Sequence, residues 1–259
     1  MSEQQNQYLY AVIRRDEVSS FEDIKPVSAP EATLEAHELG DVAVVTSAIE
    51  LDEVMSTRRN MLTHTRALEQ LMLGRPILPF SFGTIVNDLA VLEPVIKPEN
   101  DRLLSDLEGL RGHIEVGVRA SWNEEKIFTE IVDENEELRA IAQRVRTRPA
   151  SETYYERIEL GKRVDEIMKT KREAEGNALA DALSQVAVRS VTHSSSADMI
   201  VHDAAYLINE AAERDLYAVL EGIENQKPDR MNIKYLSPVP PYNFVAMTFT
   251  PPTVQQEAA

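Results

Sequence analysis

The segment Arg75-Pro76-Ile77-Leu78-Pro79-Phe80-Ser81-Phe82-Gly83-Thr84 decides how the rest of the chain is interpreted. Large apolar side chains occupy every second position of its centre, and a period of two is typical of a β-strand. Pro76 and Pro79 have no amide hydrogen to donate, so the predicted strand fits the edge of a sheet better than its centre. Such a strand needs a helix over one face and other strands beside it.

The first half of the chain supplies these elements. Residues 8–13 and 42–47 are apolar and rich in β-branched side chains, which predicts two buried strands. Only residues 31–38 of the charged stretch between them fit a short helix. From Thr57 to Gly74 the apolar side chains recur with the helical period, so we predict a helix that Ser56 or Thr57 caps and Gly74 ends.

The second half begins with a strand pattern and continues with helical ones. Residues 114–120 alternate between apolar and polar side chains, which predicts another strand. A long helical pattern opens at Ser151, and at ~1.5 Å per residue it would exceed the core of a small domain, so we predict that part of it projects or that it breaks, with Gly176-Asn177 as the expected place. The remaining pattern predicts a strand, a strand, a helix and a strand over residues 188–194, 199–208, 210–223 and 233–236.

These elements predict an α+β fold with two domains. The second half has the order of a ferredoxin-like domain with a long helical segment inserted in its first crossover. The first half is an abbreviated version of the same plan. We therefore predict two ferredoxin-like-type domains, at residues 1–111 and 112–249, and a disordered tail at residues 250–259.

Composition excludes several classes of protein. The 259 residues carry 44 Asp or Glu and 27 Lys or Arg, a net charge of −17, which opposes binding to nucleic acid and to anionic lipid. No apolar run approaches the ~18 residues of a membrane helix. The absence of cysteine fits a reducing cytoplasm and removes thiolate chemistry. We expect a cytoplasmic protein with no nucleic-acid or membrane partner.

Motifs for catalysis are missing from the sequence. It contains no G-x-G-x-x-G, Walker A, G-x-S-x-G or H-E-x-x-H pattern, so we predict no enzyme, no catalytic residue and no cofactor. His193, Asp198, His202 and Asp203 have donor atoms for a metal, but we favour solvated hairpin side chains and predict no metal site. For His64 we favour a semi-buried histidine bonded to a backbone carbonyl over a catalytic base.

An acidic run at residues 133–137 precedes a group of arginines. Carboxylates stabilise the beginning of a helix, which explains the run without a function. On so acidic a chain, we expect the arginines to pair with these carboxylates rather than to bind phosphate: Arg139, Arg144, Arg146 and Arg148.

Aromatic and proline residues of two segments allow two interpretations. They pack as core beneath the helices, or the proline-rich edges leave backbone groups and apolar surface for a partner. We favour the core for Phe80 and Phe82 and leave both interpretations open for residues 240–244. The candidate partner-binding residues are Pro79, Phe80, Pro240, Pro241, Tyr242 and Phe244.

Three segments carry a family resemblance. They are Tyr8-Leu9-Tyr10, the helix with His64 followed by residues 77–86, and the closing run at residues 237–245. In this order they resemble the opening, middle and closing motifs of the GvpL/GvpF family of gas vesicle proteins. The chain departs from the usual Val, Gly and Trp of that family at Ala67, Ser237 and Val239.

The resemblance implies an accessory gas vesicle protein with two ferredoxin-like-type domains, located in the cytoplasm in association with gas vesicles. It implies a minor structural component or assembly factor that binds the small hydrophobic shell protein, the major gas vesicle shell protein, and other accessory proteins. The alternative is a small-ligand-binding or enzymatic ferredoxin-like protein of the cytosol, because ferredoxin-like domains host both kinds of function. A deep polar pocket would favour the alternative.

Overall fold

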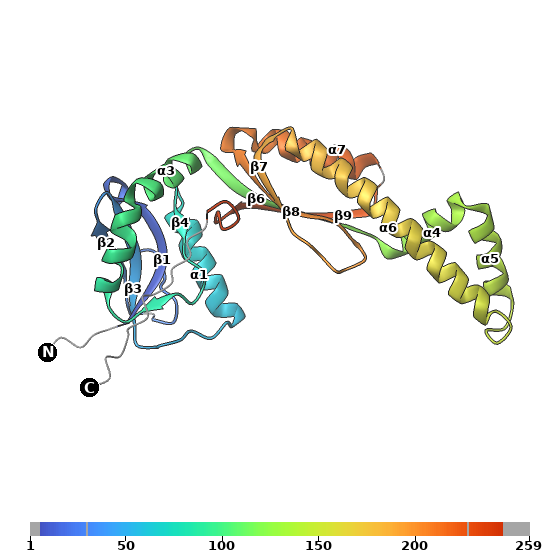
Figure 1. Ribbon diagram of the computed structural model, residues 1–259, viewed down its shortest axis with the longest axis horizontal. Coiled ribbons are helices and arrows are strands. Elements are labelled where there is room, and N and C mark those ends of the chain that lie inside the picture. The colour runs from blue at the N-terminus through green and yellow to red at the C-terminus, as the bar shows by residue number, and fades with distance from the viewer. Residues whose placement is uncertain (1–5, 30, 227, 246–259) are drawn as a thin grey trace. The chain divides into compact units, whose positions relative to one another are not determined.

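The computed structural model describes residues 6–29, 31–226 and 228–245, and it divides into two compact units (Figure 1). Unit 1 comprises Met1–Glu115 and Pro238–Ala259, and unit 2 comprises Val116–Ser237. The segment after the last strand, which we expected to close the second domain, therefore packs with the first unit. The tail predicted at residues 250–259 lies outside the described residues.

Unit 1 is built on a sheet in which the central strands are almost fully buried. The strand order is β2-β3-β1-β4, and β5 also pairs with β1. All described pairs in this sheet are antiparallel. The strands are β1 (Asn6–Arg14), β2 (Leu34–Leu39), β3 (Val42–Ile49), β4 (Leu78–Pro79) and β5 (Ile85–Val86).

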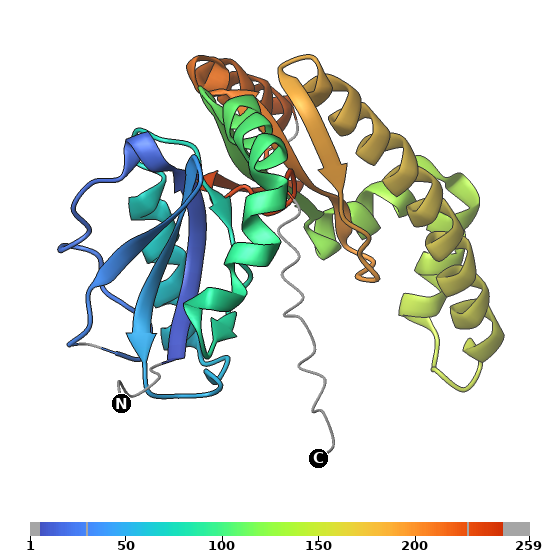
Figure 2. The ribbon, with the colours of Figure 1, turned by 60° about the vertical axis from the view of Figure 1, so that its left-hand side comes forward.

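Helices cover both faces of this sheet (Figure 2). Helix α1 (Arg58–Leu71) contributes its buried stripe to a core that includes Tyr8 and Tyr10, while α3 (Asn100–Leu110) contacts β1 and β3. Burial on both faces explains why the strands read as continuous apolar runs. Short helices complete the connections: η1 (Arg15–Glu17), η2 (Leu89–Val91), α2 (Glu93–Ile96) and η3 (Lys97–Glu99).

The predicted cap and end of α1 are confirmed, but the strand after it is shorter than expected. The Thr57 hydroxyl accepts a hydrogen bond from the Asn60 amide at 3.2 Å, and Gly74 has a left-handed φ of 75°. Of the strand that we predicted directly after the helix, only Leu78 and Pro79 form a regular strand. Pro79 cannot donate to the ladder, and pairing with β1 ends in one further bond, from the Phe80 amide to the Tyr10 carbonyl at 2.8 Å.

The short helix expected at residues 31–38 is wrong. That stretch contributes β2, whose residues pair in register with β3 from Leu34 opposite Ser47 to Leu39 opposite Val42. Local propensity was weak, and the exposed edge of β3 supplied hydrogen bonds that a short isolated helix does not offer.

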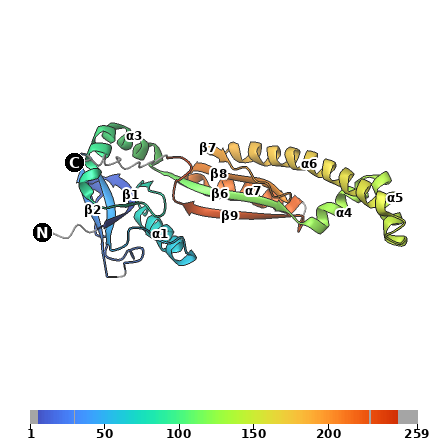
Figure 3. The same ribbon diagram turned by 60° about the horizontal axis from the view of Figure 1, so that its bottom comes forward.

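Unit 2 is a second sheet with helices on one face. Its strand order is β7-β8-β6-β9, and both α6 and α7 lie over the same side (Figures 1 and 3). The strands are β6 (His113–Trp122), β7 (Ala187–Thr192), β8 (Ile200–Asn209) and β9 (Met231–Val239). The helices are α4 (Glu124–Glu134), α5 (Glu136–Thr147), α6 (Tyr154–Ser184), the short η4 (Glu210–Ala212) and α7 (Glu213–Gln226).

The first crossover of unit 2 forms a helical arm, which we define as α4, α5 and the N-terminal half of α6 (Figure 3). These three helices contact one another and share an apolar core that includes Ile127, Leu138, Leu160 and Val164. Asn123 and Asn135 cap α4 and α5 with side-chain oxygens. The inserted helical segment that the sequence predicted is thus present as a packed structure.

Of the two outcomes expected for this long helix, the break at Gly176-Asn177 does not occur, because α6 runs unbroken for 31 residues, and its N-terminal half instead extends into the helical arm. Gly176 serves packing instead: a Cβ at this position would lie 2.6 Å from the Val201 carbonyl oxygen. The missing side chain lets α6 approach β8 closely, and packing against the sheet and the arm supports the helix along its length. Among the described residues, no helix is long and apolar enough to cross a membrane.

Candidate functional site

His64 of α1 lies in a buried cluster of aromatic rings within unit 1. His64 is only 2% exposed to solvent. The imidazole stacks on Tyr10 with ring centroids 6.0 Å apart and meets Tyr8 and Phe82 edge-on at 5.6 Å and 5.7 Å. Strand β1 supplies the two tyrosines because its inward side chains alternate along the sheet.

Hydrogen bonds tie this histidine to two separate parts of the chain. The Tyr8 hydroxyl lies 3.0 Å from Nδ1 of His64, and the Tyr242 hydroxyl lies 2.8 Å from Nε2. Tyr8 also accepts from the Gly83 amide at 3.0 Å, and Tyr242 donates to the Phe80 carbonyl at 3.4 Å. One assignment satisfies every group: Tyr8 donates to Nδ1, and Nε2–H donates to Tyr242.

The cluster is electrically neutral under ordinary conditions. Burial lowers the pKa of His64 from 6.5 to about 4, although the Phe80 carbonyl opposes the shift. Burial also raises the pKa of both Tyr8 and Tyr242 well above the usual value. A general base works best with a pKa near the operating pH. The arrangement therefore fits a neutral hydrogen-bonded contact rather than a proton-transfer site. We call the hydrogen-bonded group of Tyr8, His64 and Tyr242 the latch.

The latch fastens the closing segment of the chain onto unit 1. Beside Tyr242, the Asn243 side chain donates to Glu115 at 2.6 Å and the Asn243 amide donates to the same carboxylate at 3.1 Å. Glu115 is 3% exposed and Phe244 is 7% exposed. Two hydrogen bonds to a buried carboxylate and one buried ring hold this segment in a single conformation.

The candidate partner-binding residues meet at this latch, but most of them are inside. Pro79, Phe80, Pro240, Pro241 and Phe244 are buried. Tyr242 is 41% exposed, so it presents one ring edge to solvent while its hydroxyl points inward to His64. Of the six, only Tyr242 has enough surface to meet a partner directly.

Sequence reasoning missed that the three resemblance segments form one hydrogen-bonded cluster. Tyr8, His64, Phe80 and Tyr242 come from all three segments and join in one chain of contacts. Their separation along the chain hides these contacts. The only sign of them in the sequence was that each of the rings of Tyr8, His64 and Tyr242 carries a polar atom, which needs a partner when buried. The expected backbone partner of His64 is present as the Phe80 carbonyl, and two tyrosine hydroxyls that were not expected join it.

The four hairpin residues with metal-binding donors do not form one cluster, although His193 Nδ1 lies 3.6 Å from Asp203 Oδ1. The expectation of solvated side chains is wrong for His202 and Asp203, which are largely buried. His202 is buried and its Nε2 lies 2.7 Å from the Tyr206 hydroxyl, while Asp203 accepts from Arg119 at 2.7 Å. The Asp198 side chain is 76% exposed and faces Arg172. Within the described ranges, no group of three His, Asp or Glu side chains is placed to hold a metal ion.

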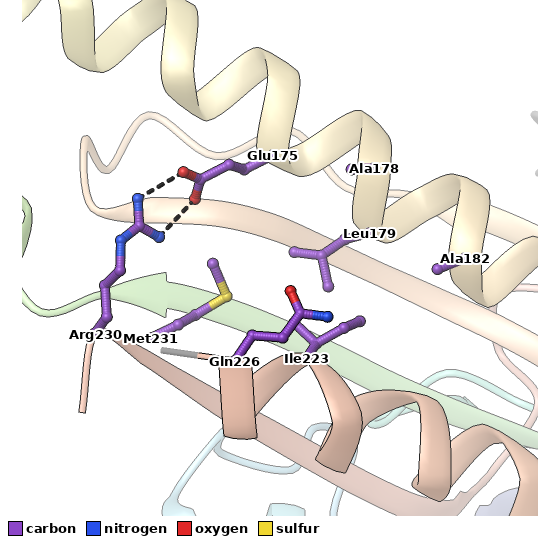
Figure 4. A pocket seen from close by; sticks show the side chains of 8 residues that line it. All are labelled: Glu175, Ala178, Leu179, Ala182, Ile223, Gln226, Arg230 and Met231. Atoms are coloured by element: carbon purple, nitrogen blue, oxygen red, sulfur yellow. Dashed lines mark hydrogen bonds and ion pairs between the residues drawn. The ribbon is translucent and has the colours of Figure 1, made fainter. Parts of the chain in front are cut away.

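Unit 2 contains a groove of about 580 Å³ between α6 and α7 (Figure 4). Apolar side chains form its floor and alanines of α6 form one wall, while a charged pair closes one end. The lining residues are Glu175, Ala178, Leu179, Ala182, Ile223, Gln226, Arg230 and Met231.

The charges at the end of this groove already have partners. Arg230, whose side chain is 9% exposed, donates to Glu175 at 2.6 Å and 2.9 Å and to Glu130 at 2.5 Å and 2.9 Å. The Trp122 indole donates to Glu175 at 2.8 Å, and Lys171 donates to Glu130 at 3.0 Å. Burial opposes ionisation of Glu175, but hydrogen bonds from Arg230 and Trp122 prevail and lower its pKa. The lowered pKa of Glu175 fits a structural ion pair rather than a general acid or base.

Comparison with known proteins gives a consistent result. The family model described as "Gas vesicle synthesis protein GvpL/GvpF" matches residues 6–246. Gas vesicle protein F of Dolichospermum flosaquae is 25% identical over 199 residues, covering 76% of this chain and 80% of that protein. Gas vesicle protein F of Streptomyces sp. (strain CB03234) is 24% identical over 238 residues, covering 92% of this chain and 98% of that protein.

Solved structures agree with this fold. The crystal structure of gas vesicle protein GvpF from Anabaena sp. PCC7120 aligns with a TM-score of 0.77 at 20% identity, covering 95% of this chain and all of that one. GvpF from Microcystis aeruginosa aligns with a TM-score of 0.69, also at 20% identity, covering 92% and 98%. The mixed arrangement of helices and sheets is therefore shared with both proteins.

Proposed function

The chain belongs to the GvpL/GvpF family of gas vesicle synthesis proteins, and on that premise we propose that it is a non-enzymatic accessory protein that binds the small hydrophobic shell protein during gas vesicle formation. It works in the cytoplasm, in association with gas vesicles and alongside other accessory proteins. A very apolar subunit aggregates when free, and a carrier of net charge −17 keeps the pair dispersed until the subunit joins the shell.

The observation that carries this proposal is exposed apolar area on four residues near His64 in unit 1, which we call the His64 flank: Met61, Phe82, Ile85 and Tyr242. Met61 is 49% exposed and lies one turn before His64 on α1. Phe82 and Ile85 are half-buried, and Tyr242 is fixed by its hydroxyl. Partly exposed rings and a flexible thioether are side chains that suit the binding of an apolar helix or strand.

We further propose that both units follow a ferredoxin-like plan, with boundaries at residues 115/116 and 237/238. In each sheet the order is second, third, first and fourth strand of that unit. Unit 2 has helices in both crossovers, whereas unit 1 has a short 3-10 helix and a loop in the first. This plan supports a binding protein by placing its surfaces on the outside of two rigid cores.

A co-purification experiment tests the function. The full chain with an affinity tag is co-expressed with the shell protein, and the shell protein is measured in the supernatant and in the eluate. We expect co-purification, and we expect Met61→Glu to reduce it about tenfold by placing a charge on the flank. Val188→Glu is the matched control, because Val188 is 58% exposed in β7 of unit 2. Failure of the wild-type chain to retain or solubilise the shell protein ends the proposal.

Fractionation separates two forms of this role. A carrier stays in the supernatant when vesicles are floated and washed, whereas a minor shell component stays with the vesicles.

Tyr242→Phe keeps the ring but removes the hydroxyl bond to His64, so it distinguishes an effect on the latch from an effect on the apolar surface.

The groove between α6 and α7 favours a second candidate function, the binding of a small ligand. Its apolar floor and its amide and ion-pair ends would suit an elongated, mainly apolar molecule. Native mass spectrometry of the chain purified from its own cells tests this. A bound small molecule that Ala178→Phe displaces supports the candidate, and a ligand-free mass opposes it.

A further inference from the structure

The end of the helical arm has a charge opposite to that of the whole chain. Residues 144–163 carry six Arg or Lys and three Glu, a net charge of +3 on a chain of −17. We expected all four arginines of this region to pair with the carboxylates of residues 133–137, but only one does so, and a second pairs with a glutamate outside that run. Arg139 pairs with Asp133 and Arg144 with Glu156. In the described parts of the chain, Arg146 and Arg148 have no ion pair and are exposed.

Exposed aromatic surface lies at the same end. Tyr154 is 60% exposed, Tyr155 is 82% exposed and Ile158 is 41% exposed. The two rings meet edge-to-face with centroids 5.4 Å apart. These residues and Lys162 lie on the outward side of α6, away from Leu160 and the core of the arm. The arm itself therefore leaves these three side chains exposed to solvent.

The support beneath this surface is rigid. The Arg144 guanidinium donates to Glu156 at 2.8 Å, and Arg157 donates to the Val145 carbonyl at 3.1 Å, so both bonds join α5 to α6. In the connecting loop, Thr153 is fully buried and donates to the Pro149 carbonyl at 3.1 Å. A surface held in this way loses little conformational entropy when a partner binds.

From these observations we propose that the arm tip is a second docking surface, which binds an acidic protein segment whose carboxylates flank an apolar side chain. We define the arm tip as Arg146, Arg148, Tyr154, Tyr155, Ile158 and Lys162. Tyrosine and arginine are the residues that most often dominate binding energy at protein interfaces. The unpaired cations select carboxylates, and the rings and Ile158 receive the apolar side chain.

This partner differs in chemistry from the very apolar subunit proposed for the His64 flank. Nucleic acid also meets Arg and Tyr side chains, but the surrounding chain is acidic, and Glu152, Glu156 and Glu159 stand in the same segment. These carboxylates would repel a continuous phosphate backbone, whereas a short acidic segment reaches the exposed cations without crossing them.

The test uses the full chain and a set of fluorescein-labelled peptides of fifteen residues. All share the same leucine and tryptophan positions, and their polar positions are filled with Glu, Gln or Lys. Fluorescence anisotropy measures the Kd of each. We expect the Glu peptide to bind about tenfold more tightly than the Gln peptide, and to weaken with added NaCl. Tyr155→Ala is expected to weaken Glu-peptide binding about tenfold.

Charge reversal supplies the decisive comparison. Arg146→Glu/Arg148→Glu should abolish the preference for Glu and favour the Lys peptide. Arg66→Glu/Lys234→Glu changes the net charge equally at two exposed sites elsewhere, and should leave the preference intact. Circular dichroism confirms that both variants are folded. An unchanged preference in the arm-tip variant overturns the proposal.

Two other occupants would also overturn it. One is a single-stranded oligothymidine that binds as tightly as the Glu peptide and is lost in the same arm-tip variant. The other is a second copy of the chain, detected as a dimer by sedimentation of the wild type that the arm-tip variant converts to monomer.

Discussion

Unit 1 and unit 2 arrange their strands in the same relative order but are stabilised in different ways. In unit 1, β1 and β3 are buried on both faces, and Leu9 and Val44 are as inaccessible as Tyr10 and Val45 on the opposite face. In unit 2, β9 alternates between half-buried and exposed residues, and most of β7 is exposed. One unit has apolar cover on two sides and the other on one.

The polar groups inside the two units also differ. Unit 1 encloses the neutral chain Tyr8, His64 and Tyr242, whereas unit 2 holds Arg230 between Glu130 and Glu175 at the edge of its groove. One strand order can therefore be stabilised by a two-sided apolar core, which encloses a neutral hydrogen-bonded chain and the buried carboxylate of Glu115, or by a thinner core with an ion-pair cluster. The thinner unit is the one that carries the long inserted arm.

The largest expected effect comes from removing the charge at the centre of the unit 2 cluster. Arg230→Met leaves two partly buried carboxylates without their cation, and we expect the free energy of unfolding of unit 2 to fall by about 3–5 kcal/mol. Trp122 is the only tryptophan and lies in unit 2, so urea unfolding followed by its fluorescence reports this unit. Arg163→Met removes exposed pairs with Glu137 and Glu159 in the same unit and should cost less than about 1 kcal/mol. Equal losses in the two variants would contradict the role of the cluster.

A pair of leucines tests the difference in core cover. Leu9→Ala in β1 empties a fully buried site, and we expect unit 1 to lose about 2–5 kcal/mol. Leu236→Ala in β9 removes a side chain that is 62% exposed, and we expect unit 2 to change by about 0.5 kcal/mol or less. Hydrogen exchange measured by mass spectrometry on peptides from each unit gives both values. Similar losses would mean that the open face of unit 2 is covered in solution.

The pH dependence of unit 1 tests its neutral cluster. Burial holds the pKa of His64 at about 4 in the folded chain against 6.5 ordinarily. Above pH 6.5 both states bear neutral histidine and the contribution is fully present; as the pH falls toward 4, the unfolded chain gains a proton first and stability is lost. We expect roughly 3 kcal/mol of loss from this residue between pH 7 and 4.

His64→Gln isolates that contribution, because an amide stays neutral throughout this range. Unfolding free energies of unit 1 are measured by hydrogen exchange for both chains at each pH, and the two curves should approach each other as the pH falls. Parallel curves would show that His64 does not titrate across this window.

Much of the secondary structure followed from local patterns. Alternation predicted β6, and the helical period predicted α1. The errors arose where a distant segment decided the outcome. Residues 34–39 form a strand because β3 was available for pairing. The helix continues through Gly176, where the close approach of β8 leaves room only for a glycine.

The candidate site shows the same division. Sequence singled out Tyr242 and the segment around Phe80, and it noted His64 separately. It could not show that His64 joins them, because 178 residues separate His64 from Tyr242 along the chain. It also could not separate Arg144, which pairs, from Arg146, which remains exposed.

The sequence by itself determined the acidic character of the chain, the absence of catalytic motifs, the α+β class and the family, because these depend on composition, on local periodicity and on short motifs in order. Tertiary structure alone decided which aromatic residues are buried, that the closing segment returns to unit 1, and that a cationic, aromatic surface ends the helical arm. Burial and pairing are properties of neighbours in space, and folding brings together residues whose order along the chain gives no measure of distance.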